Sequence, residues 1–251
     1  GVVTATSFSG SGANLTGIEN NPGLRTDRGQ GGNTIGGSSA GAALASNDGS
    51  WDNTFIGKDA GKLNSGGDYN TFVGASSGDA NTTGSLNVGV GRQSLGANTV
   101  GQNNTALGHG TLADNTTGSV NTAVGQNALG NNTTANENTA VGANALFTNT
   151  TGEQNVGVGN SALDANTTGA YNTALGYDAL GANTTAILGT ALGWGALAAN
   201  TTGAQNTAVG GNCLQTNTTG DYNVAVGRQS LQANTTASNN TAVGYQAMVA
   251  N

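Results

Sequence analysis

Residues 121–154 read "NTAVGQNALGNNTTANENTAVGANALFTNTTGEQ" and contain nearly the same motif twice, at an interval of 17 residues. The same interval holds on both sides of this stretch. Units begin at Asn53, Asn70, Asn87, Asn104, Asn121, Asn138, Asn155, Asn172, Gly189, Asn206, Asn223 and Asn240. These twelve units follow one another without an insertion or a deletion, and their consensus is N-T-A-V-G-x-x-A-L-x-x-N-T-T-G-x-x. A fixed period of this length is typical of a solenoid, in which each repeat packs on its neighbours.

Two positions of the unit, counted from its first Asn, are almost invariant and are interpreted as corners of the coil. Position 5 is always Gly and position 12 is always Asn, as in Gly57, Gly125, Gly142 and Gly210 and in Asn132, Asn149, Asn166 and Asn183. Glycine suits a positive φ or a close backbone approach, and Asn tolerates the left-handed region better than most residues. We therefore expect the chain to turn at both positions.

Between the corners, "NTAVG" alternates with the period of a β-strand. We expect the aliphatic residue at position 4 to point inward, the small residue at position 3 to point outward, and the Leu at position 9 to supply a second inward side chain. A helix does not fit, because no stretch between corners approaches the length of an ordinary helix. The predicted fold is an all-β parallel β-solenoid, a β-roll of twelve 17-residue coils.

In such a coil each side chain lies above its counterpart one repeat earlier, at the spacing of paired strands. The Asn residues at position 12 are then expected to form an amide ladder, and the Thr residues that follow them a hydroxyl ladder. The 251 residues include 44 Gly, 4% aromatic and 8% charged residues, which predicts a thin core. Because a single thin rod has few apolar contacts, we expect a homo-oligomer, a trimer of parallel rods.

Composition also bears on partners and chemistry. A net charge of −7 with six scattered Lys and Arg residues argues against a nucleic-acid partner. The single Cys213 allows neither an internal disulfide nor a multi-cysteine metal site, and a small buried residue is its expected role. No apolar run has the length of a membrane span, so membrane insertion is not expected. His109 is the only histidine, and no phosphate loop or calcium-loop spacing is present; we expect neither an enzyme nor a cofactor.

The first 50 residues differ from the repeats. Residues 1–32 are interpreted as a connector or assembly segment, residues 33–52 as a degenerate first coil or cap, and residues 53–251 as the solenoid. Within the solenoid, positions 6 and 17 vary freely and are expected to face outward. Tyr177 and Trp194 at position 6 are one coil apart, and with Asp178 and Tyr245 they are candidate contacts for a glycan or receptor. A stabilising or intersubunit role for these rings stays open, and so does the role of Tyr69, Tyr171 and Tyr222 at position 17.

The motif "NTAVG", followed by a small residue, an aliphatic residue and a polar turn, resembles the "SVAIG" repeats in the head domains of trimeric autotransporter adhesins. That resemblance implies a left-handed parallel β-roll with three chains to a trimer. The repeat is also similar to those of phage tail fibres and related virion appendages, and the opening "GVVTATSFSGSGANLTGI" is similar to segments of such virion proteins. The resemblance implies a location on the virion, or otherwise outside the cell or at its surface.

The expected function is a structural and adhesive fibre segment, a rigid rod for host attachment. Its expected partners are further copies of the chain, other virion appendage proteins and a host cell-surface glycan or protein receptor. Two alternatives stay open: the head of a bacterial trimeric surface adhesin, and an ice-binding β-solenoid that would use the regularly spaced Thr residues of "NTT".

Overall fold

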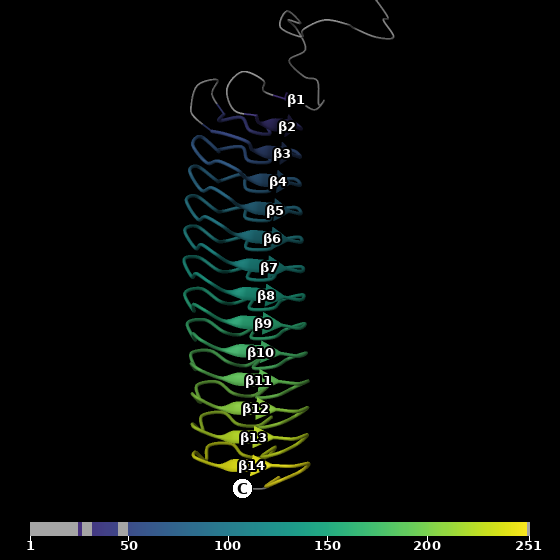
Figure 1. Ribbon diagram of the computed structural model, residues 1–251, viewed down its shortest axis with the longest axis vertical. Helices are drawn as coiled ribbons and strands as arrows, with labels where there is room; N and C mark the ends of the chain where they lie inside the picture. The colour runs from purple at the N-terminus through teal and green to yellow at the C-terminus, as the bar shows by residue number, and fades with distance from the viewer. Residues whose placement is uncertain (1–24, 27–31, 45–49, 250–251) are drawn as a thin grey trace, which may run out of the picture.

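The computed structural model describes residues 25–26, 32–44 and 50–249, and within them the chain winds into a straight rod (Figure 1). Each coil contributes one strand of three residues. The strands are β2(Thr34–Gly36), β3(Thr54–Ile56), β4(Thr71–Val73), β5(Val88–Val90), β6(Thr105–Leu107), β7(Thr122–Val124), β8(Thr139–Val141), β9(Val156–Val158), β10(Thr173–Leu175), β11(Thr190–Leu192), β12(Thr207–Val209), β13(Val224–Val226) and β14(Thr241–Val243). A short β1(Arg25–Thr26) precedes them. The predicted β-solenoid is confirmed.

One sheet runs the length of the described rod, with its strands in sequence order. β2 to β14 pair in parallel, and from β3 onward every residue pairs with the residue 17 positions further along, as Thr122 does with Thr139. Only β1 is antiparallel, where Arg25 pairs with Ile35 and Thr26 with Thr34. Because no residue is inserted between β3 and β14, the same positions of the 17-residue unit face one another along this part of the sheet.

The Gly at position 5 forms a corner for the expected reason. Across the coils its φ lies in the positive region, at 123° in Gly125 and 135° in Gly142. A Cβ atom on Gly125 would lie 2.6 Å from the carbonyl oxygen of Gly142 in the next coil. No side chain fits between the two backbones, which explains why this position is invariant.

The left-handed conformation expected at position 12 is wrong, because the Asn residues there do not adopt a positive φ. Left-handed residues occur instead at positions 7, 9 and 17, for example Asn127 at 56°, Leu129 at 50° and Val120 at 61°. Such conformations cost roughly 1–2 kcal/mol each for a residue with a Cβ atom. Burial of the Leu side chain at position 9 offsets part of this cost in the coils from Leu95 to Leu231, where these leucines are fully buried.

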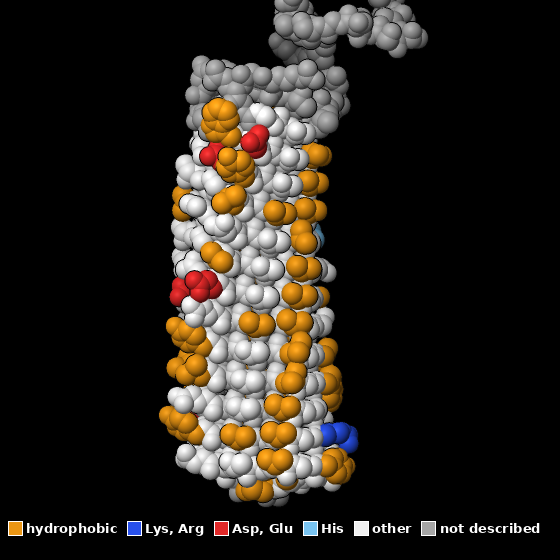
Figure 2. All heavy atoms as spheres, in the orientation of Figure 1, with side chains coloured by type: hydrophobic (Ala, Val, Ile, Leu, Met, Phe, Trp, Pro, Cys, Tyr) orange, Lys and Arg blue, Asp and Glu red, His pale blue; other side chains and the backbone are white. Residues whose placement is uncertain are grey.

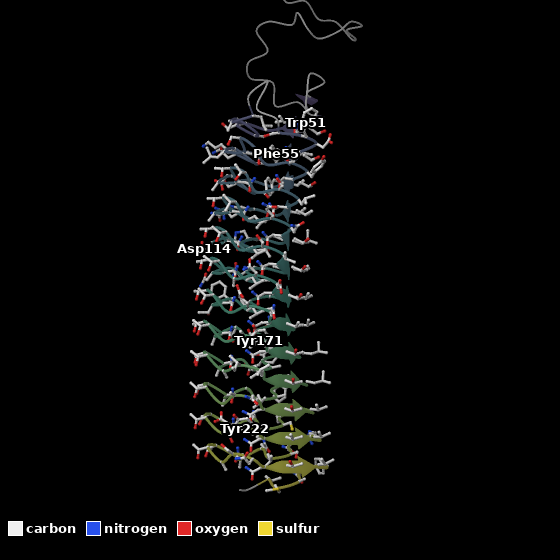
Figure 3. All side chains as sticks on the ribbon, turned by 60° about the vertical axis from the view of Figure 1, so that its left-hand side comes forward. Trp51, Phe55, Asp114, Tyr171 and Tyr222 are labelled. Carbon is white, nitrogen blue, oxygen red and sulfur yellow. The ribbon has the colours of Figure 1, made fainter. Side chains whose placement is uncertain are left out.

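The strand faces are reversed relative to the sequence prediction. Position 3 points into the coil, where Ala123 and Ala140 are fully buried, whereas position 4 points outward, where Leu175 is 45% exposed. The more apolar residue therefore faces out. The reason is space: the coil is so narrow that the Leu at position 9 fills its interior and leaves room opposite for no more than a methyl group. Figure 3 shows the inward and outward side chains of the strands, with Phe55 inside the coil.

The first coils fill the same space in the opposite way. Phe55 and Phe72 occupy position 3, where later coils have Ala or Gly. Gly61 and Gly78 occupy position 9, where later coils have Leu and the last has Met. A Cβ atom on Gly78 would lie 2.5 Å from the ring of Phe72. The two rings stack with centroids 5.5 Å apart and an interplanar angle of 11°. One large side chain per coil is thus the rule, and it enters from either wall.

Two ladders of buried amides run along the rod. The predicted ladder at position 12 is present: Asn132 Nδ2 donates to Asn115 Oδ1 at 2.8 Å and to the Ala135 carbonyl at 3.1 Å. A second ladder at position 1 was not predicted. There the backbone N–H of Asn138 donates to Asn121 Oδ1 at 3.0 Å, and Asn138 Nδ2 donates to the Gly152 carbonyl at 3.0 Å. The carbonyl at position 15 thereby accepts from both ladders, as Gly152 does from Asn149 as well.

The expected hydroxyl ladder takes a different form. The Thr at position 13 donates to the backbone carbonyl of its counterpart in the next coil, as Thr116 does to Thr133 at 3.0 Å. The hydroxyl groups do not bond to one another. These side chains therefore tie successive coils together through the main chain.

The N-terminal boundaries proposed from the sequence fall partly on residues outside the described part of the chain. Asn33 begins a coil whose strand β2 pairs with β3, and Asn53 Nδ2 donates to Asn33 Oδ1 at 3.1 Å. Asn33 and Asn53 are 20 residues apart, so this first coil is three residues longer than the others. Residues 1–24, 27–31 and 45–49, to which most of the proposed connector and part of the proposed cap belong, lie outside the described residues.

Candidate functional site

A continuous line of aliphatic side chains runs along the outer face of the sheet. It consists of the position-4 residues Ile56, Val73, Val90, Leu107, Val124, Val141, Val158, Leu175, Leu192, Val209, Val226 and Val243, and is called the aliphatic stripe below. Some of these side chains are partly buried and the others are exposed. Among the exposed ones, the exposed fraction ranges from 36% at Val141 to 69% at Val243. Figure 2 shows hydrophobic side chains one above another along the strands. Soluble monomers seldom expose apolar surface in so ordered an array.

The stripe is narrow. On one side it is bounded by the corner glycines of position 5, and on the other by the outward residues of position 2, which are Thr in nine of the twelve units and Val88, Val156 and Val224 in the others. The sheet thus offers a face two residues wide, one column aliphatic and one column mostly Thr. Sequence reasoning missed this surface because it assigned the aliphatic residue of each strand to the core.

The position-6 side chains form a second column, on the edge of the coil beside the corner glycines. The structure brings Tyr177 and Trp194 together as predicted: their rings stack with centroids 6.4 Å apart and an interplanar angle of 18°. Tyr177 is 53% and Trp194 57% exposed. A pair of exposed, nearly parallel rings at this edge can take part in binding as well as in stabilising the coil stack.

Tyr245 does not join this pair. It lies three coils beyond Trp194, and the Arg228 guanidinium lies over its ring at 5.9 Å from the centroid. A similar contact occurs earlier in the column, where Arg92 Nη1 donates to His109 Nε2 at 3.1 Å. The single histidine therefore contacts a cation on the surface. These contacts follow from the 17-residue spacing, which places residues 92 and 109, and residues 228 and 245, one coil apart.

Asp178 follows Tyr177 in the chain, at position 7 of the same unit. Its carboxylate lies against Gly181, where an added Cβ atom would overlap it, on the side of the coil that carries Asp164. Burial raises the pKa of the Asp164 carboxyl, and the charge of Asp178 raises it further. Burial also raises the pKa of Asp178 itself. The charge of Asp178 thus acts on Asp164, and a contribution of Asp178 to a site with Tyr177 and Trp194 stays a prediction.

The tyrosines at position 17 lie at the opposite loop of the coil. Tyr69, Tyr171 and Tyr222 are 53–56% exposed and all have a positive φ. They are six and three coils apart, so they cannot form one contact surface. Tyr171 and Tyr222 are labelled in Figure 3. In the same part of the coil, the Thr residues of position 14 are exposed, and their hydroxyl groups make no hydrogen bond with other described residues.

Cys213 is the small buried residue that the sequence predicted. Its thiol lies 3.1 Å from the carbonyl oxygen of Ala225, and burial raises its pKa to about 11. It occupies position 8, where other coils carry Ala, Ser or Thr, so a thiol is not required there. A thiol with this pKa is protonated near neutral pH and is a poor nucleophile.

Across residues 25–26, 32–44 and 50–249, no three His, Cys, Asp or Glu side chains gather closely enough to hold a metal ion. The same residues contain no helix long and apolar enough to cross a membrane. The described surface offers the aliphatic stripe, the position-6 column and the exposed Thr residues of position 14 as candidate sites. Comparison with models of known protein families, with curated proteins and with solved structures finds no match to this chain.

Proposed function

We propose that the chain is a structural rod segment of an extracellular fibre, assembled with further copies of itself through the aliphatic stripe. The observation that carries this proposal is the stripe itself, an apolar column that is half-exposed in every coil from β3 to β14. A rod with one apolar line along its side buries that line best against the same line of a parallel copy, because identical coils then meet at identical heights.

The width of the stripe favours three chains. The aliphatic stripe is one residue wide, so each rod can bury only a narrow line of apolar side chains. Three such lines can pack together around a common threefold axis. Full burial of a Val or Leu side chain contributes about 1.5–3 kcal/mol, so burying the remaining 40% or so contributes about 0.6–1.2 kcal/mol per residue. Twelve residues then contribute about 7–14 kcal/mol per chain, against an association cost of about 4–15 kcal/mol. Assembly therefore needs most of the length of the rod.

The resemblance of the repeat to those of phage tail fibres and trimeric adhesin heads supports the same proposal. A trimeric rod of this kind holds a binding tip away from a particle, or carries weak contacts along its side that act together. We place it in a virion tail fibre, with other appendage proteins and a host receptor as its partners. The head of a bacterial surface adhesin would use the same physics.

The test is sedimentation of the full chain beside a double variant, Leu175→Asp with Leu192→Asp. Both residues are more than 40% exposed, so each coil should tolerate the change, whereas two carboxylates per chain at the common axis should dissociate the assembly. Thr168→Asp with Thr185→Asp is the matched control, because it adds the same charge at the opposite edge of neighbouring coils. An assembly that survives the stripe variant, or is lost equally in the control, would rule the stripe out as the interface.

A second candidate function rests on a separate observation. From Thr117 to Thr236 the position-14 Thr residues are exposed in every coil, with hydroxyl groups that make no hydrogen bond to the rest of the described chain. A straight column of Thr at strand spacing is the kind of array that an ice-binding solenoid requires. Inhibition of ice recrystallisation by the unchanged chain, abolished by Thr168→Lys with Thr185→Lys, would favour this function over the fibre.

A further inference from the structure

The position-6 column is interrupted at one step near the C-terminal end of the rod. Trp194, Gly211, Arg228 and Tyr245 occupy four successive coils, and only Gly211 lacks a side chain. Its φ is not in the left-handed region, and a Cβ atom built on it would approach nothing closer than the Trp194 carbonyl oxygen at 3.8 Å. Backbone geometry and space would thus admit any residue here. The gap is not a requirement of the fold.

The gap has a defined height. The backbone N–H of Asn212 donates to the Trp194 carbonyl at 2.8 Å, and that of Gln229 donates to the Gly211 carbonyl at 3.0 Å, so the three coils stack directly at this edge. Two coil steps separate Trp194 from Arg228 by about 9.6 Å. A ring in van der Waals contact with groups on both sides needs about 7–8 Å. The backbone spacing therefore leaves enough height above Gly211 for one ring between the position-6 residues of the two flanking coils.

The two walls of this slot differ in chemistry. One face of Trp194 is turned to Tyr177, so its opposite face is turned to the slot and is available to pack on an apolar ring face. The other wall is the Arg228 guanidinium, which contacts the ring of Tyr245 on its far side. No described carboxylate forms an ion pair with Arg228. The slot thus lies between an aromatic ring and a guanidinium that has no ion-pair partner among the described residues. A planar guanidinium can donate two parallel hydrogen bonds to a carboxylate.

The surroundings are neutral and rich in amides. Gln229 and Gln246 follow Arg228 and Tyr245 at position 7, and Gln246 Nε2 donates to Gln229 Oε1 at 3.3 Å. Asp221 is the one carboxylate in the sequence between residues 189 and 249, and its Oδ1 accepts from the Ala204 backbone N–H in the loop at position 16. An anionic ligand therefore meets no carboxylate here, although the chain as a whole carries a net charge of −7.

We propose that the slot between Trp194 and Arg228, above Gly211, binds one hexopyranose ring bearing a carboxylate, a uronic acid residue of a surface polysaccharide. The apolar face of the sugar packs on Trp194, its carboxylate accepts from Arg228, and its hydroxyl groups exchange hydrogen bonds with the flanking amides. This inference does not rest on the proposed assembly, since one chain supplies the whole slot. In an assembly the slot recurs once per chain and gains avidity.

The test uses the fluorescence of Trp194. The chain has two Trp residues, so Trp51→Phe leaves Trp194 as the only one and provides the reference protein. Trigalacturonate is the probe, and galactotriose is its uncharged counterpart. We expect a saturable change in Trp194 emission with trigalacturonate at millimolar concentration, as befits a single shallow site. Arg228→Gln should weaken this binding at least tenfold and bring it to the level of galactotriose.

Gly211→Tyr in the reference protein fills the slot and should abolish the change in emission. Ala143→Tyr is the matched control, because it adds the same ring at position 6 of a distant coil, and it should bind as the reference does. If Gly211→Tyr does not fold, Trp194→Leu with saturation-transfer NMR of the sugar tests the same wall. Absence of saturable binding, equal binding of both sugars, or unchanged binding in Gly211→Tyr would overturn the proposal. None of these outcomes bears on the assembly state, which sedimentation reports.

Discussion

The position-1 amide ladder is broken at one place, and repairing it should stabilise the rod. Gly189 stands where the other eleven units have Asn. Its backbone N–H still donates to Asn172 Oδ1 at 2.9 Å, but it offers no amide to the next coil. The backbone N–H of Asn206, which would receive that partner, has no hydrogen bond within the described chain, whereas Asn223 N–H donates to Asn206 Oδ1 at 2.9 Å one coil later.

The variant Gly189→Asn should restore four hydrogen bonds. The new Nδ2 reaches Asn172 Oδ1 and the Gly203 carbonyl, and the new Oδ1 accepts from the N–H and the Nδ2 of Asn206. At a net 0.5–1.5 kcal/mol each, these bonds contribute about 2–6 kcal/mol. Ordering the side chain costs roughly 1–2 kcal/mol, which leaves a net stabilisation of about 0–5 kcal/mol. The φ of Gly189 is not in the left-handed region, so the backbone accepts a side chain.

The free energy of unfolding should be compared among the unchanged chain, Gly189→Asn and Gly189→Ala by guanidinium titration. The Ala variant separates the effect of losing Gly, about 0.4–1 kcal/mol, from that of the amide. Because solenoids can unfold in parts, amide hydrogen exchange at Asn206 should be followed as a local measure. We expect slower exchange at Asn206 in the Asn variant only. Equal stability of the Asn and Ala variants, with unchanged exchange, would refute the ladder as a source of stability.

Three further predictions follow from the coil interior. Phe72→Ala should lower the free energy of unfolding by about 3–5 kcal/mol. Adding Gly78→Leu should recover most of this loss, because one large side chain then again fills the coil. A double variant no more stable than Phe72→Ala would contradict this. Cys213→Ser should change the unfolding free energy by less than about 1 kcal/mol, and the thiol should react with a maleimide only after denaturation. The pKa of Asp164 is raised, so the folded state binds the carboxyl proton more tightly than the unfolded state does. The free energy of unfolding should therefore rise as pH falls from 7 toward the ordinary carboxyl pKa of 3.8, and should rise less in Asp164→Asn. Thermal unfolding across this pH range measures the effect.

The fold was predictable because its signal is redundant. Twelve copies of one period report the coil length, the strand at "NTAVG" and the Gly corner independently of any single residue. The stacked contacts at position 6 were predictable for the same reason, since a spacing of 17 residues means adjacency. Tyr177 and Trp194 illustrate this directly.

The direction of the side chains was not predictable from hydrophobicity. Position 4 is more apolar than position 3, and only the narrow cross-section of the coil explains why Val141 faces outward and Ala140 inward. The early coils do carry a sequence signal for this arrangement. One unit pairs Phe72 at position 3 with Gly78 at position 9, whereas a later unit pairs Ala174 with Leu180, which indicates that positions 3 and 9 share one space. The ladder at position 1 was not predicted, because Asn is also common in turns and its presence alone does not indicate a buried amide.

The most direct test of the account is the mass of the unchanged chain in solution, measured by light scattering coupled to size-exclusion chromatography. If the aliphatic stripe joins three parallel rods, the mass is three times the 24.3 kDa of one chain at all concentrations above the dissociation constant. A stable species of 24.3 kDa at high concentration would contradict the account, because the apolar line along the sheet would then be exposed to water in the working form of the protein.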